Sequence, residues 1–428
     1  MDLLPFPICP DFRIAETSIF TDHPGATEQS DLRSSSTPWA SAPSAKARPL
    51  TGHLRCDVLV VGAGITGALV AERLTREGRD VVLIDREDPG QGSTIASTAM
   101  LLWEIDRPLS ALVDLYGFER AARTYRASFD AVNGLLSLAA QAGFPCAMRS
   151  RNSLYLASGD TLKPLQQEHS LRERADLPGA LLDHAALMSR FGITRAGALL
   201  SPVAADADPV QLTYGLLRVA QQRGAQVLRA HAIKFETGGK SVHVSVDNAS
   251  DIEARFVVLA TGYVMPDIVG PTPHQAASSW AIATKPQPRN LWPTEALIWE
   301  ASENYYYART TRGGRIIFGG EDDEAVVEPE ARDAATPAKA ARLCEKLRAL
   351  WPRAVGDIDF RWSGTFDTTK DGLPLIGTVP GTRNILAAYG YGGNGITFSY
   401  LAAALIAKLI AGQTSPLLDD FAIDRDID

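Results

Sequence analysis

The hydrophobic pattern of residues 57–85 predicts one β-α-β unit. Asp57–Val61 is a short run rich in β-branched residues, which is typical of a buried parallel strand. Ile65–Arg76 then gathers its apolar and small residues on one helical face, and Gly78 supplies a helix stop. Val81–Ile84 is a second apolar run, so we expect a strand, a helix and a parallel strand in succession.

The rest of the chain predicts helices and strands in alternation, with a β-rich middle. Strands alternating with helices at both ends indicate an α/β nucleotide domain that is interrupted by a second domain. Pro337 fits the first turn of a helix, where its missing N–H costs nothing. The pattern predicts helices over 108–143, 210–224 and 336–350, strands near 225–228, 242–246, 255–260 and 384–388, further strands within 277–320, and a final helix.

Residues 1–50 differ in composition from the remainder of the chain. They hold seven of the 26 prolines and one of the 35 glycines, and no apolar period persists. We expect an extension that is partly disordered, or one that packs on the body through Trp39. Its opening residues lack a secretory pattern, and the longest apolar run, Ile396–Ile410, contains Lys408 and is short for a membrane span. A cytoplasmic protein is predicted.

Composition excludes several classes. The chain has 428 residues, which predicts two or three domains, and 45% of them are hydrophobic. A net charge of −8 argues against nucleic-acid binding, which depends on excess Lys and Arg. The four cysteines and seven histidines are scattered, so we expect neither a disulfide framework nor a metal site.

A glycine-rich turn joins the first strand to the first helix. Gly62-Ala63-Gly64-Ile65-Thr66-Gly67 is a GxGxxG between strand and helix, and Asp85 ends the next strand. Gly62 permits the tight turn, Gly64 lets a pyrophosphate approach the backbone, and Gly67 lets the helix pack on the strand. The helix N-terminus attracts phosphate, and Asp85 can accept hydrogen bonds from both hydroxyls of an adenosine ribose. A dinucleotide site is predicted, with a 2′-phosphate disfavoured by the acid.

Two later segments carry further signals. Val257–Gly262 is an apolar strand that ends in Ala260-Thr261-Gly262. Tyr389–Thr397 opens the final helix and repeats the GxGxxG spacing, but too few residues follow for a second nucleotide unit. One interpretation is a flexible glycine loop that caps the helix. The other is a surface against which the flat ring of a flavin lies, where the helix dipole stabilises the negative charge of the reduced ring.

Taken in order, these segments resemble the FAD-dependent D-amino acid oxidase superfamily. The stretch from Trp362–Phe366 through Asp371–Gly377 adds to the resemblance, which spans about residues 37–412. It implies an α/β fold with a discontinuous, glutathione-reductase-like Rossmann FAD-binding domain and a β-rich α+β substrate domain. The implied division is an N-terminal extension at 1–50, FAD-domain parts at 51–145, 201–272 and 361–428, and substrate-domain parts at 146–200 and 273–360.

The resemblance also assigns cofactor contacts. FAD is expected to be noncovalent, because no cysteine lies near Gly364. The loop after the second strand lacks an Arg-Asn pair frequent in the family, and Asn394 replaces a frequent histidine. Besides the first glycine motif and Asp85, the implied cofactor residues are Arg86, Gly92, Ser93, Thr94, Ser97, Thr98, Ala232, Ala260, Thr261, Gly262, Gly364, Gly392, Gly393, Asn394, Gly395, Ile396 and Thr397.

The implied activity is oxidation of a C–N bond of an amino acid or related amine. Hydride passes from carbon to flavin N5, and the imine then hydrolyses. Tyr307 and Arg309 alternate along one predicted strand, so their side chains share a face. One interpretation is that Arg309 binds a substrate carboxylate and Tyr307 shapes the pocket. The other is an ordinary half-buried strand with an exposed arginine. Glu104 is either an ammonium ligand or a surface acid, and Lys285 and Lys370 receive no role.

Other interpretations stay open from the sequence alone. They are an NADH-dependent flavin reductase or monooxygenase, a non-catalytic flavin-binding protein, and a plain NAD-dependent dehydrogenase. A second nucleotide unit for nicotinamide is missing, which disfavours the first. Oxygen, a quinone or a carrier protein could reoxidise the flavin, and neither the substrate nor the oligomeric state follows from the sequence.

Overall fold

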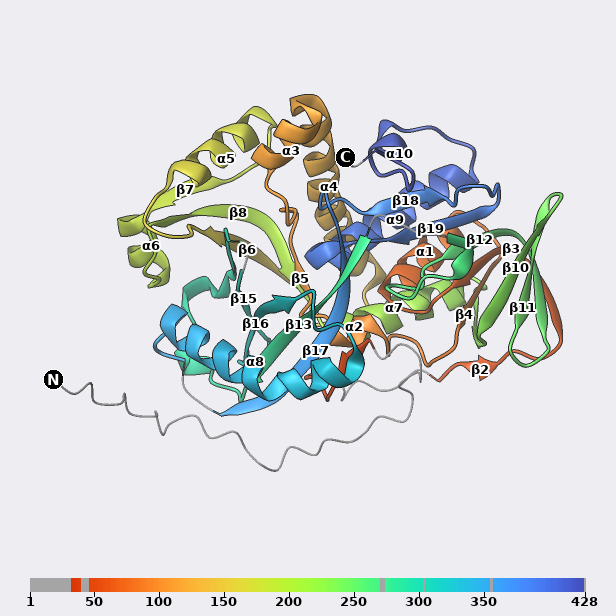
Figure 1. The fold of residues 1–428 in the computed structure, drawn as a ribbon, viewed down its shortest axis with the longest axis horizontal. Coiled ribbons are helices and arrows are strands. Elements are labelled where there is room, and N and C mark those ends of the chain that lie inside the picture. Colours follow the sequence, from red (N-terminus) through yellow and green to blue (C-terminus); the bar gives the residue numbers. More distant parts are fainter. Residues whose placement is uncertain (1–31, 40–45, 270–273, 303–304, 355–356, 427–428) are drawn as a thin grey trace.

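The computed structural model describes residues 32–39, 46–269, 274–302, 305–354 and 357–426. The arm predicted for residues 1–50 therefore lies largely outside the described residues. Two mixed sheets dominate the fold, with helices packed against them (Figure 1). We call the sheet that contains the predicted β-α-β unit the nucleotide sheet. Its parallel neighbours are, in order, β12 (Asp251–Leu259), β3 (His53–Val61), β4 (Val81–Asp85), β9 (Gln226–Arg229) and β2 (Arg48–Pro49).

Strand β12 is the branch point of this sheet. Its first half pairs antiparallel with β11 (Ser241–Val246), which continues into β10 (Ala232–Gly238). Its second half pairs in parallel with β19 (Ile385–Tyr389), beside β18 (Leu375–Thr378). The carboxyl ends of β3, β4, β12 and β19 thus meet at one edge, where ligands bind in open α/β sheets.

Three helices cover the nucleotide sheet and meet one another. Helix α1 (Ile65–Arg76) has the predicted bounds and packs on α7 (Pro209–Gln222) and α9 (Gly395–Ile410). Asp208 caps α7 by accepting from the backbone N–H groups of Val210 and Gln211. Together with the short helix η4 (Gly392–Asn394), α9 forms a 19-residue apolar stretch of mean hydropathy 1.3 that is long enough to cross a membrane, but 67% of it is buried, as in a core helix.

The second sheet is larger and lies over the open edge of the first. Its long central strands β13 (His274–Thr284) and β17 (Ile358–Thr369) pair antiparallel along their whole length. Around them the order is β1-β17-β13-β16-β15-β14-β6-β8-β5, and β7 pairs with β8. The remaining bounds are β1 (Arg33–Ser34), β16 (Ile316–Asp323), β15 (Tyr307–Thr310), β14 (Leu297–Glu300), β6 (Arg149–Leu156), β8 (Gly197–Asp206), β5 (Met100–Leu101) and β7 (Ala180–Asp183).

Helix α8 begins earlier than the sequence predicts. It runs Pro329–Leu350, so Pro337 lies inside the helix and the prediction that it starts the helix is wrong. The extra turns are held by tertiary contacts, because Trp280 Nε1 donates to Thr336 Oγ1 and Arg332 is fully buried. The other helices are α2 (Ser93–Ala96), α3 (Leu109–Tyr116), α4 (Phe118–Ala142), α5 (Lys163–Arg174), α6 (His184–Phe191) and α10 (Pro416–Asp420).

Sheet membership places two chain crossings later than the predicted boundaries. The boundary at 200/201 falls inside β8, which belongs to the second sheet through Asp206. The boundary at 360/361 falls inside β17, whose second half carries Gly364. The chain therefore passes between the two sheets beyond residue 206 and again beyond residue 369.

Candidate active site

A cavity of about 880 Å³ lies between the two sheets. This volume is near the upper end for small-molecule sites, which run from about 300 to 1,000 Å³. One end lies at the carboxyl ends of the parallel strands, beside Gly62, Asp85 and Ala260. The other end is lined by residues of the second sheet and its loops, among them Tyr307 and Tyr305, whose hydroxyl lies beside Gly393 just before α9.

Glycines of the first motif let three backbone segments approach closely. Gly62 has φ +111°, and a Cβ there would overlap the carbonyl oxygen of Ala260. A Cβ on Gly67 would overlap the Gly62 carbonyl oxygen, so this glycine sets the distance between α1 and β3. Gly62 and Gly64 line the cavity, whereas Gly67 stands behind the wall.

Asp85 is fixed by the turn it faces. Its Oδ2 accepts from the Ala63 N–H at 2.6 Å and its Oδ1 from the Glu87 N–H at 2.9 Å. Burial raises the pKa of the Asp85 carboxyl, while these two N–H groups oppose the rise. Arg86, His231, Ala232 and Lys234 line the cavity beside it, so this end combines one anchored carboxylate with cations.

The loop from Gly92 to Ala99 forms the floor of the cavity and is held by two tryptophans. Trp39 Nε1 donates to the Ser97 carbonyl at 2.8 Å, and Trp362 Nε1 donates to the Ala96 carbonyl at 2.8 Å. Trp39 is 6% exposed, as expected if the N-terminal extension packs on the body. Neither indole was predicted to hold this segment: the sequence suggested only that Trp39 packs on the body and that Trp362 belongs to the stretch that carries the family resemblance.

Two buried hydroxyls of the cavity wall have no partner among the described residues. They are Ser93 Oγ and Thr261 Oγ1, which come from the loop after β4 and from the turn after β12. A buried hydroxyl without a hydrogen bond costs free energy, so both atoms point to a polar ligand. With the glycine cradle and Asp85, they fit the phosphates and sugars of a dinucleotide.

The glycines before α9 face a carboxylate that the sequence did not single out. Asp106 Oδ2 accepts from the Gly393 N–H at 2.6 Å, and a Cβ on Gly392 would overlap the same oxygen. Asn394 Nδ2 donates to the Glu104 carbonyl at 2.5 Å, and Thr397 Oγ1 donates to the Leu102 carbonyl at 2.8 Å. The segment before Asp106 is thus tied to the start of α9.

Aromatic side chains form the roof over these glycines. The rings of Tyr305 and Tyr307 lie 6.1 Å apart, centroid to centroid, and a side chain at Gly319 would overlap Tyr307. Ser279 Oγ lies 3.5 Å from the Tyr307 hydroxyl, and burial, together with the charge of Asp322, raises the pKa of both tyrosines. These tyrosines are therefore neutral at ordinary pH.

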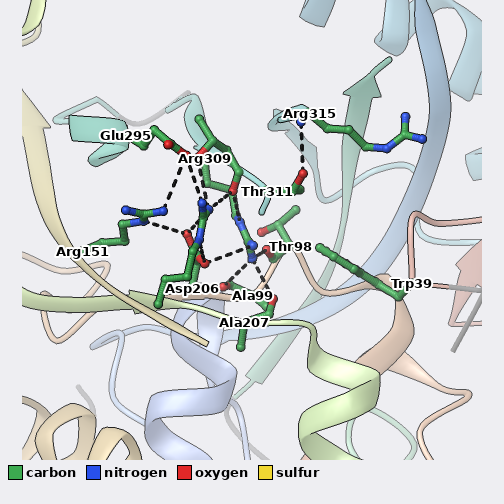
Figure 2. Close-up of polar contacts among 12 residues, drawn as sticks. Trp39, Thr98, Ala99, Arg151, Asp206, Ala207, Glu295, Arg309, Thr311 and Arg315 are labelled. Carbon is green, nitrogen blue, oxygen red and sulfur yellow. Dashed lines mark hydrogen bonds and ion pairs between the residues drawn. The ribbon is translucent and has the colours of Figure 1, made fainter. Parts of the chain in front are cut away.

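Arg309 does not line the cavity, so the prediction that it binds a substrate carboxylate is wrong. Its guanidinium is instead surrounded by acceptors of the protein itself (Figure 2). Its Nη1 donates to the carbonyls of Thr98, Ala99 and Ala207 at 2.7–2.9 Å, and its Nη2 lies 3.5 Å from Asp206. It is 2% exposed, and burial lowers its pKa to about 10, so it stays charged at neutral pH. The side chain joins β15 to β5 and β8 instead.

Glu104 is neither a surface acid nor a cavity residue. It is 1% exposed, Ser153 Oγ donates to its Oε1, and Arg172 Nη1 lies 3.9 Å away. Lys285 pairs on the surface with Asp357 at 2.9 Å. Neither Lys285 nor Lys370 lines the cavity.

The structure brings most of the predicted site residues together around one cavity. Four do not line it: Ala63, Gly67, Thr397 and Arg309. The first three act from behind the wall, through the Asp85 bond, the α1–β3 contact and the Leu102 bond. Those that line it are Gly62, Gly64, Ile65, Thr66, Asp85, Arg86, Gly92, Ser93, Thr94, Ser97, Thr98, Ala232, Ala260, Thr261, Gly262, Tyr307, Gly364, Gly392, Gly393, Asn394, Gly395 and Ile396.

Comparison with known proteins identifies the family. The chain is 27% identical over 378 residues to gamma-glutamylputrescine oxidoreductase of Escherichia coli K12, covering 85% of each protein. It is 26% identical over 424 residues to D-amino acid dehydrogenase of Rhizorhabdus wittichii, covering 86% of this chain and 99% of that protein. The glycine oxidase structure from Geobacillus kaustophilus shares the fold, with a TM-score of 0.76, 19% identity, and coverage of 88% and 100%. The family model described as FAD dependent oxidoreductase (DAO) matches residues 57–409, and the protein therefore belongs to this family of FAD-dependent oxidoreductases.

Proposed function

We propose that this enzyme oxidises the C–N bond of an amine or amino acid with noncovalent FAD. One observation carries the proposal: a single cavity joins a dinucleotide cradle at Gly62 and Asp85 to a tyrosine-lined end at the start of α9. The relatives include a gamma-glutamylputrescine oxidoreductase and a D-amino acid dehydrogenase, which supports C–N substrates. None of the described cysteines lines the cavity, which supports noncovalent binding.

Named residues would hold FAD at each end. Gly62, Gly64 and Thr66 would meet the pyrophosphate, and Asp85 the adenosine ribose. Ser93 and Thr261 offer free hydroxyls between the ends. The segment Gly392–Ile396 would meet the flavin ring, where the positive end of α9 favours negative charge by about 0.3–2 kcal/mol.

When bound, FAD supplies the two-electron acceptor for hydride from the substrate carbon. The chain's own part is to bind, orient and exclude water. Tyr305 and Tyr307 form the roof that keeps water from the reacting carbon, and the Trp39 and Trp362 bonds keep the loop below it in place. The imine product then reacts with water to give a carbonyl compound and ammonia, or an amine where the nitrogen carries a substituent. A cytoplasmic location, and oxygen, a quinone or a carrier protein as the electron acceptor, remain predictions.

An anaerobic titration tests the proposed function. The purified protein should be yellow, and its flavin absorbance should fall on addition of a suitable amine or amino acid without any nicotinamide. Acid precipitation should release the flavin into the supernatant if binding is noncovalent. Bleaching by NADH alone would contradict the proposal. So would a broad panel in which none of the amines and amino acids bleaches the flavin.

Removing the ribose acid should weaken cofactor binding. We expect Asp85→Ala to raise the Kd for FAD about tenfold to a hundredfold, because charge-assisted bonds to the ribose and the anchor of the turn are both lost. Fluorescence titration of apoprotein with FAD measures this. Asp88→Asn, a nearby acid outside the cavity lining, is the control and should bind FAD normally.

A further inference from the structure

The inner chamber is the end of the cavity lined by Asp106, Ser279, Trp299, Tyr305 and Tyr307. Its acidic side chain is Asp106; burial raises the pKa of this carboxyl, and the Gly393 N–H opposes the rise. Two Arg or Lys side chains line the cavity among the described residues. Arg86 follows β4 and Lys234 lies on β10, and both stand at the other end of the cavity, beside Asp85. Over the described residues that line the cavity, the inner chamber therefore offers an anion and no cation.

Asp106 stands where a substrate would meet the glycine turn. Its carboxylate is exposed toward the cavity, and Gly393 holds it through the 2.6 Å bond to Oδ2. The Cβ position of Gly393 lies 3.0 Å from Asp106 Oδ1 and 3.4 Å from Tyr305 Oη. The acid and the tyrosine hydroxyl thus flank one glycine, with room between them because that residue has no side chain.

A second acid reinforces the negative field. Asp322, on β16 outside the cavity lining, lies close enough to Tyr305 for its charge to raise the pKa of that hydroxyl. Burial and the charge of Asp106 raise the pKa of Asp322 to about 6, so it is mostly ionised at neutral pH. Tyr305, Tyr307 and Trp299 add aromatic rings, whose faces attract cations.

Nearby arginines are committed to other groups. Arg309 donates to the backbone carbonyls of Thr98, Ala99 and Ala207. Arg332 is fully buried on α8, and its Nη1 donates to Thr365 Oγ1 at 2.8 Å from behind the cavity wall. Among the described residues that line the chamber, a carboxylate would find only neutral donors, and it would face Asp106.

We propose that the inner chamber selects alkyl amines or diamines that carry no carboxylate on the reacting carbon, with Asp106 binding the ammonium group. This inference rests on the proposed function and narrows its substrate class. The acid attracts the cationic amine, the aromatic rings hold its alkyl chain, and an amino acid is rejected because its carboxylate would meet an anion.

Matched substrate pairs test the selectivity. Putrescine against ornithine, and cadaverine against lysine (both enantiomers), differ only in the carboxylate. We expect the amines to reduce the flavin anaerobically at least about a hundredfold more efficiently than the amino acids, since a desolvated contact between like charges opposes binding of the carboxylate. Faster reduction by the amino acids, or equal rates, would overturn this inference alone. If no compound in the broader panel of amines and amino acids reduces the flavin, the proposed function itself is overturned.

Ligand binding tests Asp106 without turnover. Tetramethylammonium should perturb the spectrum of the oxidised flavin and acetate should not; the reverse ranking in the unaltered enzyme would overturn the proposal without any variant. Asp106→Asn should raise the Kd for tetramethylammonium about tenfold or more while FAD content is retained. Asp114→Asn, an exposed acid of α3, is the matched control and should bind as the unaltered enzyme does. An unchanged Kd in Asp106→Asn with full FAD occupancy would remove Asp106 from the site.

Discussion

Gly67→Ala should bind FAD far more weakly than the unaltered enzyme, although Gly67 does not line the cavity. The added Cβ would overlap the Gly62 carbonyl oxygen, so α1 must move away from β3. That movement displaces Gly64 and breaks the bond between the Ala63 N–H and Asp85. Overpacking of this kind costs about 1–3 kcal/mol, or about tenfold to a hundredfold in FAD affinity if the cost falls on the bound form.

The measurement is FAD titration of the apoprotein, with circular dichroism to confirm that it is folded. Gly238→Ala is the matched control, because nothing lies within 4 Å of a Cβ built there and it stands outside the cavity. An alanine at 67 that binds FAD with the normal Kd would show that the close approach of α1 to β3 does not shape the cradle.

Arg309→Met should destabilise the whole protein and leave substrate selection unchanged. The substitution keeps an unbranched stem but removes the guanidinium, which leaves buried carbonyls of Thr98, Ala99 and Ala207 without their partner. Removing one member of a buried ionic network costs about 3–5 kcal/mol. A clear fall in melting temperature is therefore expected.

A surface ion pair provides the comparison. Arg55 pairs with Glu253 with 75% of the Arg55 side chain exposed, so Arg55→Met should cost less than about 1 kcal/mol. A stable Arg309→Met enzyme with a raised KM for carboxylate substrates would instead restore the substrate role that the sequence predicted.

Local sequence patterns were enough to predict the nucleotide half of the fold. The period of Ile65–Arg76 and the β-branched run before it depend on neighbours in the chain, and both elements form as predicted. The GxGxxG and Asp85 also follow from local chemistry, because a tight turn and a strand-end acid are local features. Their meeting in one cavity follows from the parallel order of β12, β3 and β4.

Long-range contacts account for what the sequence could not show. Arg309 alternates with Tyr307 along β15, but its guanidinium is drawn to backbone carbonyls that lie far away in the chain. Pro337 lies inside α8 because packing of Arg332 and Thr336 extends the helix backward. Asp106 escaped notice because a single acid in an irregular segment has no pattern until Gly393 is placed beside it.

The span of residues that encloses the cavity sets the order of events during synthesis. Leu32 contributes to one wall and Ser399, on α9, to another, so almost the entire polypeptide must leave the ribosome before the enclosure can close. The nascent chain can form the β-α-β turn early, but it has no lid for a flavin at that stage. The coenzyme can therefore be fully enclosed only after α9 has docked on the rest of the fold.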